Sequence, residues 1–403
     1  MRVLLAPDSF GTSLTAAQAA DALADGWRRG APHDDVTACP LADGGPGFVA
    51  TLRESLGGAL DAVTVTGPLG VPAPAALLRV GSTAYVESAH ALGLDLVPSA
   101  HRDPTRTTSA GAGELVAAAL AAGARRVVVG LGGSATNDAG AGLLLALADV
   151  LLGPDAAVGA APLLRAGGGA LGAVRPDDLR WLPALRDALR DVDLVAAVDV
   201  DVPLLGLQGA SAGFAPQKGA TPEQAQDLER ALGTFAHAAV AVLGSGDARP
   251  GLLAPAGGAA GRDARAHRWT SLPGAGAAGG AGFALALLGA RLLPGAALVA
   301  DAVGLAARIA AHDLVVTGEG RTDWQSLHGK VVAEVAARAL PLAVPTVVVA
   351  GEVLVGRREL SAAGVAAAYA VAERPDQVAA ALADPAGSLA ARATRVARTW
   401  SPG

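Results

Sequence analysis

The sequence contains very little cysteine and few aromatic residues. Its single cysteine, Cys39, excludes an internal disulfide, and no Cys/His pair has the spacing of a zinc site. Aromatic residues make up 3% of the 403 residues, whereas apolar residues make up 52%. Ala, Val and Leu must therefore fill the interior, which is typical of helices packed on a sheet.

Long apolar runs and clusters of one charge are also absent. No apolar stretch reaches the roughly 20 residues that cross a bilayer, and the N-terminus does not resemble a signal peptide, so we expect a cytoplasmic protein. The formal net charge is −6 without any Lys/Arg-rich run, which argues against nucleic acid because phosphate-backbone binding needs clustered cations. We expect a small-molecule substrate, and the protein could assemble as a homodimer.

Lysine and asparagine are almost missing. Of the 31 basic residues only Lys218 and Lys330 are lysines, and Asn137 is the only asparagine. A biased genome explains the replacement of surface lysine by arginine. The survivors are candidates for positions where Arg or Asp cannot serve, because lysine is a compact point charge and arginine a planar fork.

The order of expected strands and helices predicts two regions of different character. The chain opens as strand, helix, strand, helix over residues 2–56, which is typical of a parallel sheet. Short alternating stretches over 62–87 predict antiparallel strands, and alternation of helix and strand resumes from 109. The Ala/Gly/Pro-rich residues 153–176 are expected to form a surface excursion, and residues 375–398 one helix.

The fold class predicted from this order is α/β with two domains. Both chain ends, residues 1–59 and 298–403, are expected to form a Rossmann-like parallel α/β domain. Residues 60–297 are then an inserted second domain of mixed α/β type. The length of the chain also favours two domains, because it exceeds what one hydrophobic core usually serves.

The stretch TGEGRTDWQSLHGK, Thr317–Lys330, follows an expected strand and precedes an expected helix. In open α/β sheets ligands gather at the carboxyl ends of strands. The stretch combines two acids with two cations, which suits an anionic, metal-bearing ligand such as ATP with Mg²⁺. A solvated turn with internal ion pairs is the alternative. The four charged residues are Glu319, Arg321, Asp323 and Lys330.

The stretch APDSFGTS places Asp8, Ser9 and Ser13 between the first strand and a helix N-terminus. Backbone N–H groups and hydroxyls there can bind an anion, and Asp8 could hold magnesium or take a proton. Asp43 ends the second strand in the same way. If these strands are parallel, Asp8, Asp43 and Glu319 point into one crevice, although each could be an ordinary turn acid.

A glycine-rich loop, GLGGSATND, spans Gly130–Asp138 after another expected strand. It fits the dinucleotide fingerprint G-x-G-x-x-A, but a glycine-rich chain yields such matches easily. Phosphate binding by the loop and the following helix N-terminus is better supported, and a helix cap without ligand is the alternative. The residues expected to bind the cofactor are Gly132, Gly133, Ser134, Thr136 and Asn137.

Two further segments carry candidate residues. Asp199 and Asp201 close an expected strand, and alternate strand residues face the same side, so both could face one ligand. Lys218 precedes a helix that begins with a Thr221 cap and could meet a carboxylate or a phosphate. Surface features without function are the alternative for both segments.

Taken together, these segments resemble the type I glycerate kinase family nearly from end to end. The resemblance rests on APDSF, LADGG, RDPTRTTSAGAGEL, GLGGSATNDAGAG, VDVD, GASAGFAPQKGAT, PGAGAAGGAGFA and TGEGRTDWQSLHGK, in family order. It implies transfer of the γ-phosphoryl group of ATP, with Mg²⁺, to D-glycerate, mostly giving 2-phosphoglycerate. It also implies two α/β domains with the site between them.

The resemblance implies roles for particular residues. Asp8, Asp199 and Glu319 are expected near the metal and the attacking hydroxyl, with Asp8, Asp199, Arg321 and Lys330 as catalytic residues. Lys218, Arg321 and Lys330 are expected to hold phosphate or the glycerate carboxylate.

The chain departs from the family at three places. Relatives typically carry Lys-Gly where it has Gly11-Thr12, Glu-Gly-Thr where it has Pro46-Gly47-Phe48, and Asn where it has Val202. Loss of a lysine and an acid from one crevice could cost several kcal/mol of transition-state stabilisation. A catalytically weakened homologue that binds nucleotide or glycerate is therefore one alternative to a working kinase, and an NAD-dependent oxidoreductase that uses the Gly130 loop is another.

Overall fold

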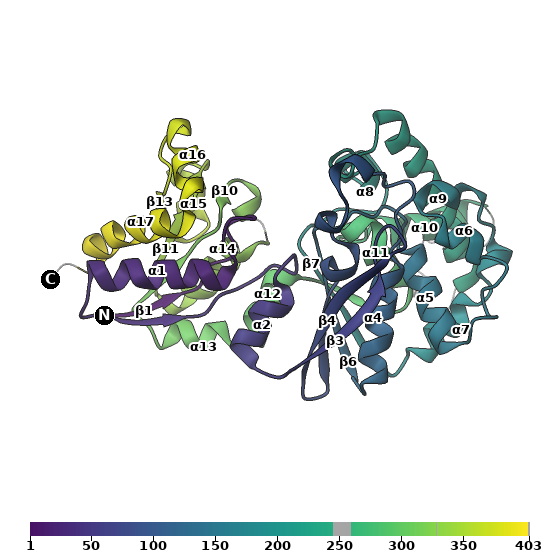
Figure 1. The fold of residues 1–403 in the computed structure, drawn as a ribbon, viewed down its shortest axis with the longest axis horizontal. Coiled ribbons are helices and arrows are strands. Elements are labelled where there is room, and N and C mark those ends of the chain that lie inside the picture. Colours follow the sequence, from purple (N-terminus) through teal and green to yellow (C-terminus); the bar gives the residue numbers. More distant parts are fainter. Residues whose placement is uncertain (245–258, 328, 402–403) are drawn as a thin grey trace. The chain divides into compact units, whose positions relative to one another are not determined.

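The chain forms two compact units (Figure 1). The computed structural model describes residues 1–244, 259–327 and 329–401. Unit 1 consists of Met1–Gly57 and Pro294–Gly403, and unit 2 of Gly58–Leu293. Both units contain parallel strands, so the predicted α/β class is confirmed. The predicted domains, 1–59 with 298–403 and 60–297, stay a prediction.

Unit 1 is built on a five-stranded sheet in the order β13-β11-β9-β1-β2. Every pair of neighbouring strands in it is parallel. In chain order within the unit this is the arrangement 2-1-3-4-5, which reverses direction between β1 and β9. The strands are β1 (Arg2–Leu5), β2 (Asp35–Ala38), β9 (Leu314–Thr317), β11 (Thr346–Ala350) and β13 (Val365–Ala370).

Helices cover both faces of this sheet because alternate strand residues point to opposite sides. Val347 and Val349 of β11 pack in the core that contains α1 (Ala16–Gly30) and α17 (Pro385–Trp400). Val348 and Ala350 pack in a second core with α14 (Val331–Ala339). The strands of a parallel sheet buried on both faces are continuous apolar runs, as β11 is.

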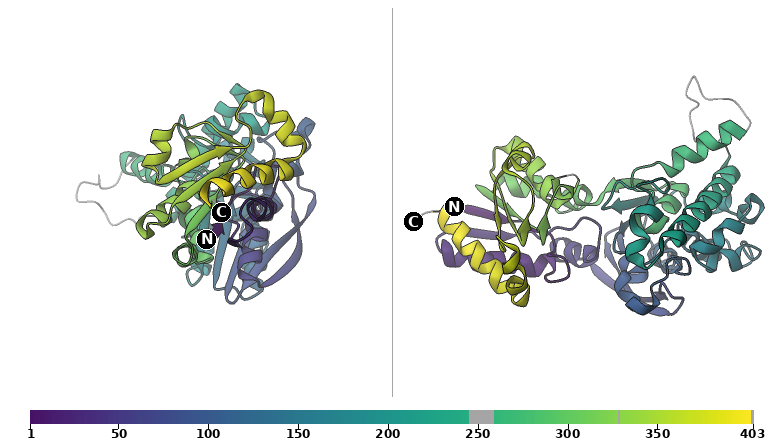
Figure 2. Two further views of the ribbon diagram at one scale, coloured as in Figure 1. Left: turned by 90° about the vertical axis from the view of Figure 1, so that its left-hand side faces the viewer. Right: turned by 90° about the horizontal axis from the view of Figure 1, so that it is seen from above.

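The helices α1 and α17, from opposite ends of the chain, lie side by side (Figures 1 and 2). Glycine makes this close approach possible. A Cβ at Gly26 would lie 2.2 Å from the Ala390 carbonyl oxygen, and one at Gly30 would lie 2.4 Å from that of Thr394. The Thr394 Oγ1 donates to the Gly26 carbonyl at 3.0 Å, which fixes the register of the two helices.

Unit 2 is built on a six-stranded sheet whose spatial order follows the chain, β3-β4-β5-β6-β7-β8. The pairs β3–β4 and β4–β5 are antiparallel, as expected for residues 62–87, whereas β5–β6 and β6–β7 are parallel. The carboxyl ends of β5, β6 and β7 therefore meet at one edge. The strands are β3 (Ala59–Thr66), β4 (Pro72–Val80), β5 (Thr83–Glu87), β6 (Arg126–Leu131), β7 (Asp193–Val198) and β8 (Arg291–Pro294).

Two expectations about local structure are wrong. Residues 153–176 are not a surface excursion, since Leu164, Leu171 and Val174 are buried in the core of unit 2. The helix expected over 375–398 is two helices, α16 (Pro375–Ala383) and α17. They divide at Asp384, which has φ −141° and whose side chain caps α17 by accepting from the Gly387 N–H at 2.9 Å.

The remaining elements connect these strands. In unit 1 they are α2 (Phe48–Leu56), α12 (Gly295–Ala302), α13 (Leu305–Ala310), β10 (Arg321–Thr322), β12 (Glu352–Val353) and α15 (Arg357–Ala362). In unit 2 they are α3 (Ala89–Leu92), α4 (Ala110–Ala121), α5 (Ala141–Leu151), α6 (Ala161–Arg165), α7 (Leu182–Ala188), α8 (Ala210–Phe214), α9 (Pro222–Leu243), α10 (Ala259–Thr270) and α11 (Ala277–Leu287).

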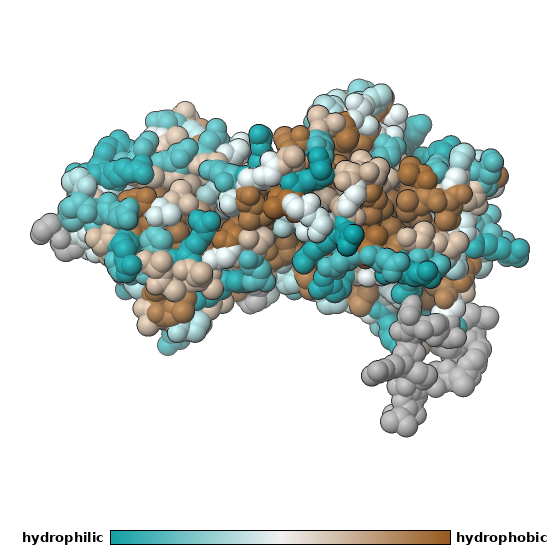
Figure 3. Space-filling model, turned by 90° about the horizontal axis from the view of Figure 1, so that it is seen from below, coloured by the Kyte–Doolittle hydropathy of each residue, from teal (hydrophilic) through white to brown (hydrophobic). Residues whose placement is uncertain are grey.

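Polar and apolar residues are interspersed on the surface. Figure 3 shows one face, on which apolar residues (brown) lie among hydrophilic ones (teal). Single exposed apolar side chains, such as Leu207 and Trp324, are normal on proteins of this composition. None of the helices within the described ranges combines the length and the hydropathy that crossing a membrane requires.

Candidate active site

In unit 1 the candidate residues gather where the strand order reverses. Asp8 follows β1 and Glu319 follows β9, and these two strands flank the reversal point. The Asp8 N–H donates to the Gly318 carbonyl at 2.8 Å, which joins the two loops directly. Ligands of open α/β sheets bind at such a point, so the strand order places both acids where a ligand is expected.

Asp8 is half-buried and lies near two other carboxylates. Its Oδ1 accepts from the Ser9 N–H at 2.6 Å. Burial raises the pKa of Asp8 well above its ordinary value, and repulsion by Asp43 and Glu319 raises it further, against the attraction of Lys330. The acids expected from their positions after β1, β2 and β9 are therefore close enough to repel one another, and the edge favours a cation.

Lys330 and Asp43 form an ion pair at the same edge. The Lys330 Nζ lies 3.5 Å from the Asp43 Oδ2, and Lys330 is the residue immediately before α14. The loop that carries Asp43 packs against the beginning of α12, where a Cβ at Gly295 would lie 1.8 Å from the Asp43 carbonyl oxygen. Only glycine permits this contact, so Gly295 helps to position the Asp43 carboxylate.

The loop after β9 holds Glu319 through its own hydroxyls. The Thr322 Oγ1 donates to the Glu319 Oε1 at 3.2 Å. Burial is the main cause of the raised pKa of Glu319, and hydrogen bonds from Ser326 and Thr322 oppose it. A Cβ at Gly318 would lie 1.9 Å from the Val349 carbonyl oxygen, so this loop also needs glycine for its contact with β11.

Other predicted residues of unit 1 lie at the rim of this edge. Arg321 is exposed and pairs with Asp323 at 3.9 Å. The Ser13 Oγ donates to the Phe10 carbonyl at 2.6 Å and thereby closes a tight turn. Gly11 forms that turn with φ +58°, and Thr12 beside it is exposed. His328, which belongs to the same signature, lies outside the described residues.

In unit 2 the glycine loop follows β6 and is held by a buried lysine. The Lys218 Nζ donates to the Thr136 carbonyl at 2.7 Å and to the Ser134 Oγ at 3.0 Å. Lys218 is 4% exposed. Burial lowers its pKa to about 8, against the attraction of Asp138 and Asp199. The expectation that a surviving lysine occupies a special position agrees with this environment.

Asp138 was not predicted as a site residue, yet it organises this loop. It is fully buried, and its carboxylate accepts from the Ser109 N–H (2.9 Å), the Ser109 Oγ (2.8 Å), the Gly140 N–H (3.1 Å) and the Gly142 N–H (3.2 Å). It thus caps the beginning of α5 and fixes Ser109, the residue before α4. The N-terminus of α5, expected to take a phosphate, is occupied by this carboxylate. The available signal was an Asp shortly before an expected helix, because Asp side chains often accept from the first N–H groups of a helix.

Asn137 and Thr136 are buried under neighbouring segments. The Asn137 Nδ2 donates to the Ser211 Oγ at 3.1 Å, and the Thr136 Oγ1 donates to the Ala278 carbonyl at 3.3 Å. Both side chains are fully buried in unit 2. Gly133 instead exposes its backbone at the carboxyl edge of the sheet with φ +62°, so Gly132–Ser134 is the part of the loop best placed for a ligand.

The backbone beside this loop is strained. Ala278, Gly279 and Gly280 adopt left-handed conformations in succession, and Ala139 opposite them has φ +52°. The Ala139 N–H donates to the Gly279 carbonyl at 2.9 Å. A left-handed alanine costs about 1–2 kcal/mol, and such strain gathers at functional sites. A Cβ at Gly279 would lie 1.9 Å from the Thr136 carbonyl oxygen.

Two acids complete the edge of unit 2. Asp199 directly follows β7 and is half-buried, whereas Asp201 is exposed. Glu87 ends β5 and is only 3% exposed. It pairs in register with Gly130 of β6. Sequence reasoning missed Glu87 because residues 62–87 were expected to be antiparallel strands, which share no carboxyl edge; the parallel pairing of β5 with β6 becomes visible only in the fold.

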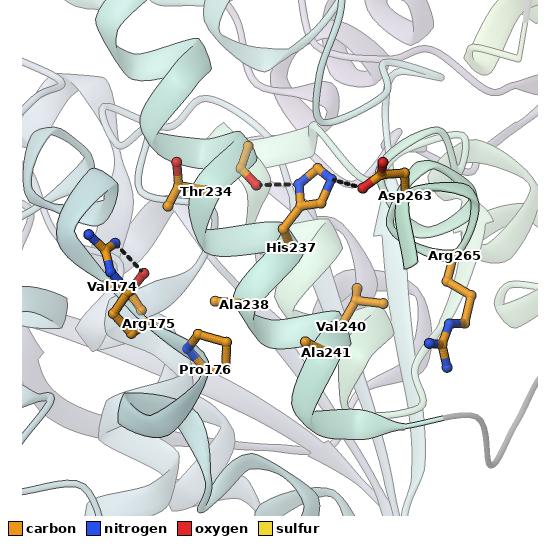
Figure 4. Close-up of a pocket in the computed structure, with 11 residues that line it drawn as sticks. Val174, Arg175, Pro176, Thr234, His237, Ala238, Val240, Ala241, Asp263 and Arg265 are labelled. Atoms are coloured by element: carbon orange, nitrogen blue, oxygen red, sulfur yellow. Dashed lines mark hydrogen bonds and ion pairs between the residues drawn. The ribbon is translucent and has the colours of Figure 1, made fainter. Parts of the chain in front are cut away.

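A cavity of about 640 Å³ lies elsewhere in unit 2 (Figure 4). It runs along α9 beside α10 and Val174–Pro176, and none of the predicted site residues lines it. His237 pairs there with Asp263 at 3.6 Å, with both side chains more than half exposed. This surface groove is separate from the strand edges.

The fold is α/β, and its acids and lysines gather at the carboxyl ends of parallel strands, where α/β enzymes bind their ligands. The model of the glycerate kinase family matches residues 3–401. Glycerate kinase of Bacillus subtilis is 40% identical over 356 residues, which cover 88% of this chain and 85% of the relative. Glycerate 2-kinase of Escherichia coli is 39% identical over 355 residues, which cover 87% of this chain and 85% of the relative.

A solved structure agrees with these sequence relatives. The crystal structure of a protein assigned as glycerate kinase 2 of Salmonella typhimurium LT2 matches with a TM-score of 0.73 and 36% identity, over 99% of this chain and 98% of that one. The chain belongs to the glycerate kinase family.

Proposed function

We propose that the protein transfers the γ-phosphoryl group of ATP to a hydroxyl of D-glycerate, with 2-phosphoglycerate as the favoured product. The observation that carries this proposal is the gathering of Asp8, Asp43, Glu319 and Lys330 at the reversal point of the unit 1 sheet, in a chain of this family. The glycerate 2-kinase relative supports phosphorylation at the second position.

The acids of unit 1 fit Mg²⁺. This ion takes one or two carboxylates together with phosphate oxygens rather than a cage of protein ligands. The described residues contain no ready-made group of three or more His, Cys, Asp or Glu ligands, but Asp43 and Glu319 raise the pKa of Asp8 by repulsion, which a cation would relieve. Asp8 and Glu319 would hold the ion.

Bound Mg²⁺ would neutralise charge on the β- and γ-phosphate oxygens. Lys330 and the exposed Arg321 would bind phosphate oxygens of the nucleotide, and Gly132–Ser134 would donate backbone N–H groups to phosphate. Lys218 would bind the glycerate carboxylate. We assign the proton released by the attacking hydroxyl to Asp8. Positioning and charge neutralisation account for most of the catalysis in such a transfer.

An assay of ADP release with D-glycerate, ATP and Mg²⁺ tests the reaction. We expect ADP to form only when all three are present, and removal of Mg²⁺ by EDTA to stop its formation. Adding enolase to the products tells the two isomers apart, because enolase acts on 2-phosphoglycerate. No ADP above the background without glycerate would contradict the proposed function.

Substitutions at the unit 1 edge test the residue roles. We expect Asp8→Ala and Lys330→Ala each to lower kcat at least about 100-fold while the melting temperature stays within a few degrees. Asp313→Ala is the matched control, because Asp313 is a more exposed acid of the same unit that pairs with Arg2 at 2.7 Å. Wild-type rates in both site variants would refute the assignment of these roles.

A weakened enzyme is the second candidate, because the turn at Gly11-Thr12 offers no side-chain cation. In that case nucleotide or glycerate binds by calorimetry while ADP release stays at background. The NAD-dependent oxidoreductase has less support, because the Asp138 carboxylate occupies the α5 N-terminus, where a pyrophosphate would have to bind. Nicotinamide binding without a response to ATP would favour it.

A further inference from the structure

We infer that Glu87 is the residue that recognises the glycerate hydroxyl that is not phosphorylated, assisted by the neighbouring Ser88. This inference rests on the proposed function and adds a specificity-determining residue to it. It concerns a hydroxyl because a carboxylate accepts hydrogen bonds, a serine hydroxyl can donate one, and a substrate hydroxyl needs both a partner that accepts and one that donates.

Glu87 lies where a ligand of unit 2 is expected. It ends β5, and β5, β6 and β7 are parallel, so its carboxylate lies at their shared carboxyl edge. Ala84 and Val86 of β5 face the hydrophobic core, so by alternation Glu87 faces the other side of the sheet. Its register partner on β6 is Gly130, which has no side chain to cover the carboxylate from that direction.

Ser88 supplies a second and independent observation. It is fully buried, and its Oγ has no hydrogen-bond partner among the described residues. A buried hydroxyl without a partner costs about 1–3 kcal/mol, and such groups in native proteins call for an explanation such as a bound molecule. The Ser88 N–H donates to the Gly130 carbonyl at 3.0 Å, so Ser88 is fixed beside the same position of β6.

Glu87 and Lys218 belong to one connected edge. The helix α3 begins after Ser88, and at its end the Leu92 carbonyl accepts from the Ala135 N–H at 2.6 Å. Ala135 follows Ser134, whose Oγ accepts from the Lys218 Nζ. One short segment therefore joins the acid to the glycine loop and its lysine, all within unit 2.

The charges along this edge match a hydroxy acid. Lys218 provides a cation for the substrate carboxylate, with two of its three donors directed at Thr136 and Ser134. Glu87 provides the acceptor for a hydroxyl. The His90 Nε2 lies 3.7 Å from the Glu87 Oε2.

The test compares D-glycerate with the analogue that keeps the phosphorylated hydroxyl and lacks the other. That analogue is D-lactate if the product is 2-phosphoglycerate, and 3-hydroxypropanoate if it is 3-phosphoglycerate. A site built to bind a hydroxyl rejects the analogue without it. We expect wild-type kcat/KM to favour D-glycerate over the analogue by at least about 100-fold.

Glu87→Ala should reduce this preference at least about 10-fold, because a hydrogen bond to a charged group is lost. The loss should fall on D-glycerate, with the KM for ATP and the kcat/KM for the analogue within about 3-fold of wild type. Glu87→Gln preserves the shape and should reduce the preference in the same direction, and Ser88→Ala less strongly. Glu229→Gln is the matched control, since Glu229 is a half-buried acid of unit 2 that accepts from the Gly206 N–H at 2.6 Å. The preference of this variant for D-glycerate over the analogue should equal that of wild type.

Three results separate the claims. A wild-type protein that phosphorylates neither acid would overturn the proposed function and this inference with it. An active wild type whose preference survives both Glu87→Ala and Glu87→Gln would overturn this inference alone. Equal losses of kcat/KM for D-glycerate and the analogue in Glu87→Gln, with an unchanged melting temperature, would also overturn it, because they would show a role that does not depend on the second hydroxyl.

Discussion

Replacement of Lys218 by methionine should change how the stability of the protein depends on pH. Methionine keeps the unbranched apolar chain and removes the ammonium group. In the folded protein the pKa of Lys218 is about 8, because the side chain is 4% exposed, against an ordinary value of 10.5. Between these two values the unfolded chain binds more protons than the folded one, so stability rises with pH.

The size of this effect follows from the two pKa values. A difference of about 2.5 units corresponds to about 3 kcal/mol, which opposes folding below pH 8 and vanishes above pH 10.5. Between pH 7 and pH 9.5 the wild type should therefore gain about 2 kcal/mol relative to Lys218→Met. Other titrating groups are present in both proteins, so their contributions cancel in the difference. The lost hydrogen bonds to Ser134 and Thr136 shift the difference equally at both pH values.

Urea denaturation of both proteins at pH 7 and pH 9.5, followed by tryptophan fluorescence, measures this difference. A difference in unfolding free energy that stays constant within about 0.5 kcal/mol between the two pH values would refute the reasoning, since it would mean that Lys218 folds with an ordinary pKa. A change of opposite sign would mean that its partners outweigh its burial.

Two further substitutions test packing and capping in the two units. Gly26→Ala should lower the unfolding free energy by about 1–2 kcal/mol, because the clash with Ala390 exceeds the gain in helix propensity. Gly233→Ala is the control: it lies in α9, where the nearest atom to a new Cβ is 3.7 Å away, and should raise the unfolding free energy by about 0.5–1 kcal/mol. Changes of the same sign in urea denaturation of the two variants would contradict the packing argument. Asp138→Asn should lower the unfolding free energy by at least about 3 kcal/mol, because a carboxylate with four buried donors is lost; Asp191→Asn, at a highly exposed acid, should change it by less than about 0.5 kcal/mol.

The sequence was sufficient to predict the positions of Asp8, Asp43 and Glu319 because their prediction needs only local information. Each follows a short apolar strand, and parallel strands bring their carboxyl ends to one edge. The spatial order of those strands was not predictable in the same way. It depends on which helices cover which face, and here it places β1 beside β9, some 300 residues apart in the chain.

The two wrong expectations about local structure each followed the more prominent of two patterns in the sequence. Residues 375–398 keep an apolar helical pattern on both sides of Asp384-Pro385, and that pattern concealed a cap followed by a proline at the first helical position. Residues 153–176 are rich in small residues, which is typical of loops, yet Leu164, Leu171 and Val174 enter the core. Three consecutive glycines, Gly167–Gly169, separate Leu164 from Leu171 and interrupt the helical spacing of these residues.

The roles of Asp138 and Lys218 illustrate what a single sequence does not contain. Both are buried charges of unit 2, and a buried charge is stable only with partners that come from elsewhere in the chain. The Ser109 that donates to Asp138 lies 29 residues away, and the Ser134 that accepts from Lys218 lies 84 residues away. Composition did identify Lys218, because a chain that has exchanged nearly all its lysines for arginine kept this one. An arginine fork is too wide for a site in which a single ammonium donates to a carbonyl and a hydroxyl of the same loop.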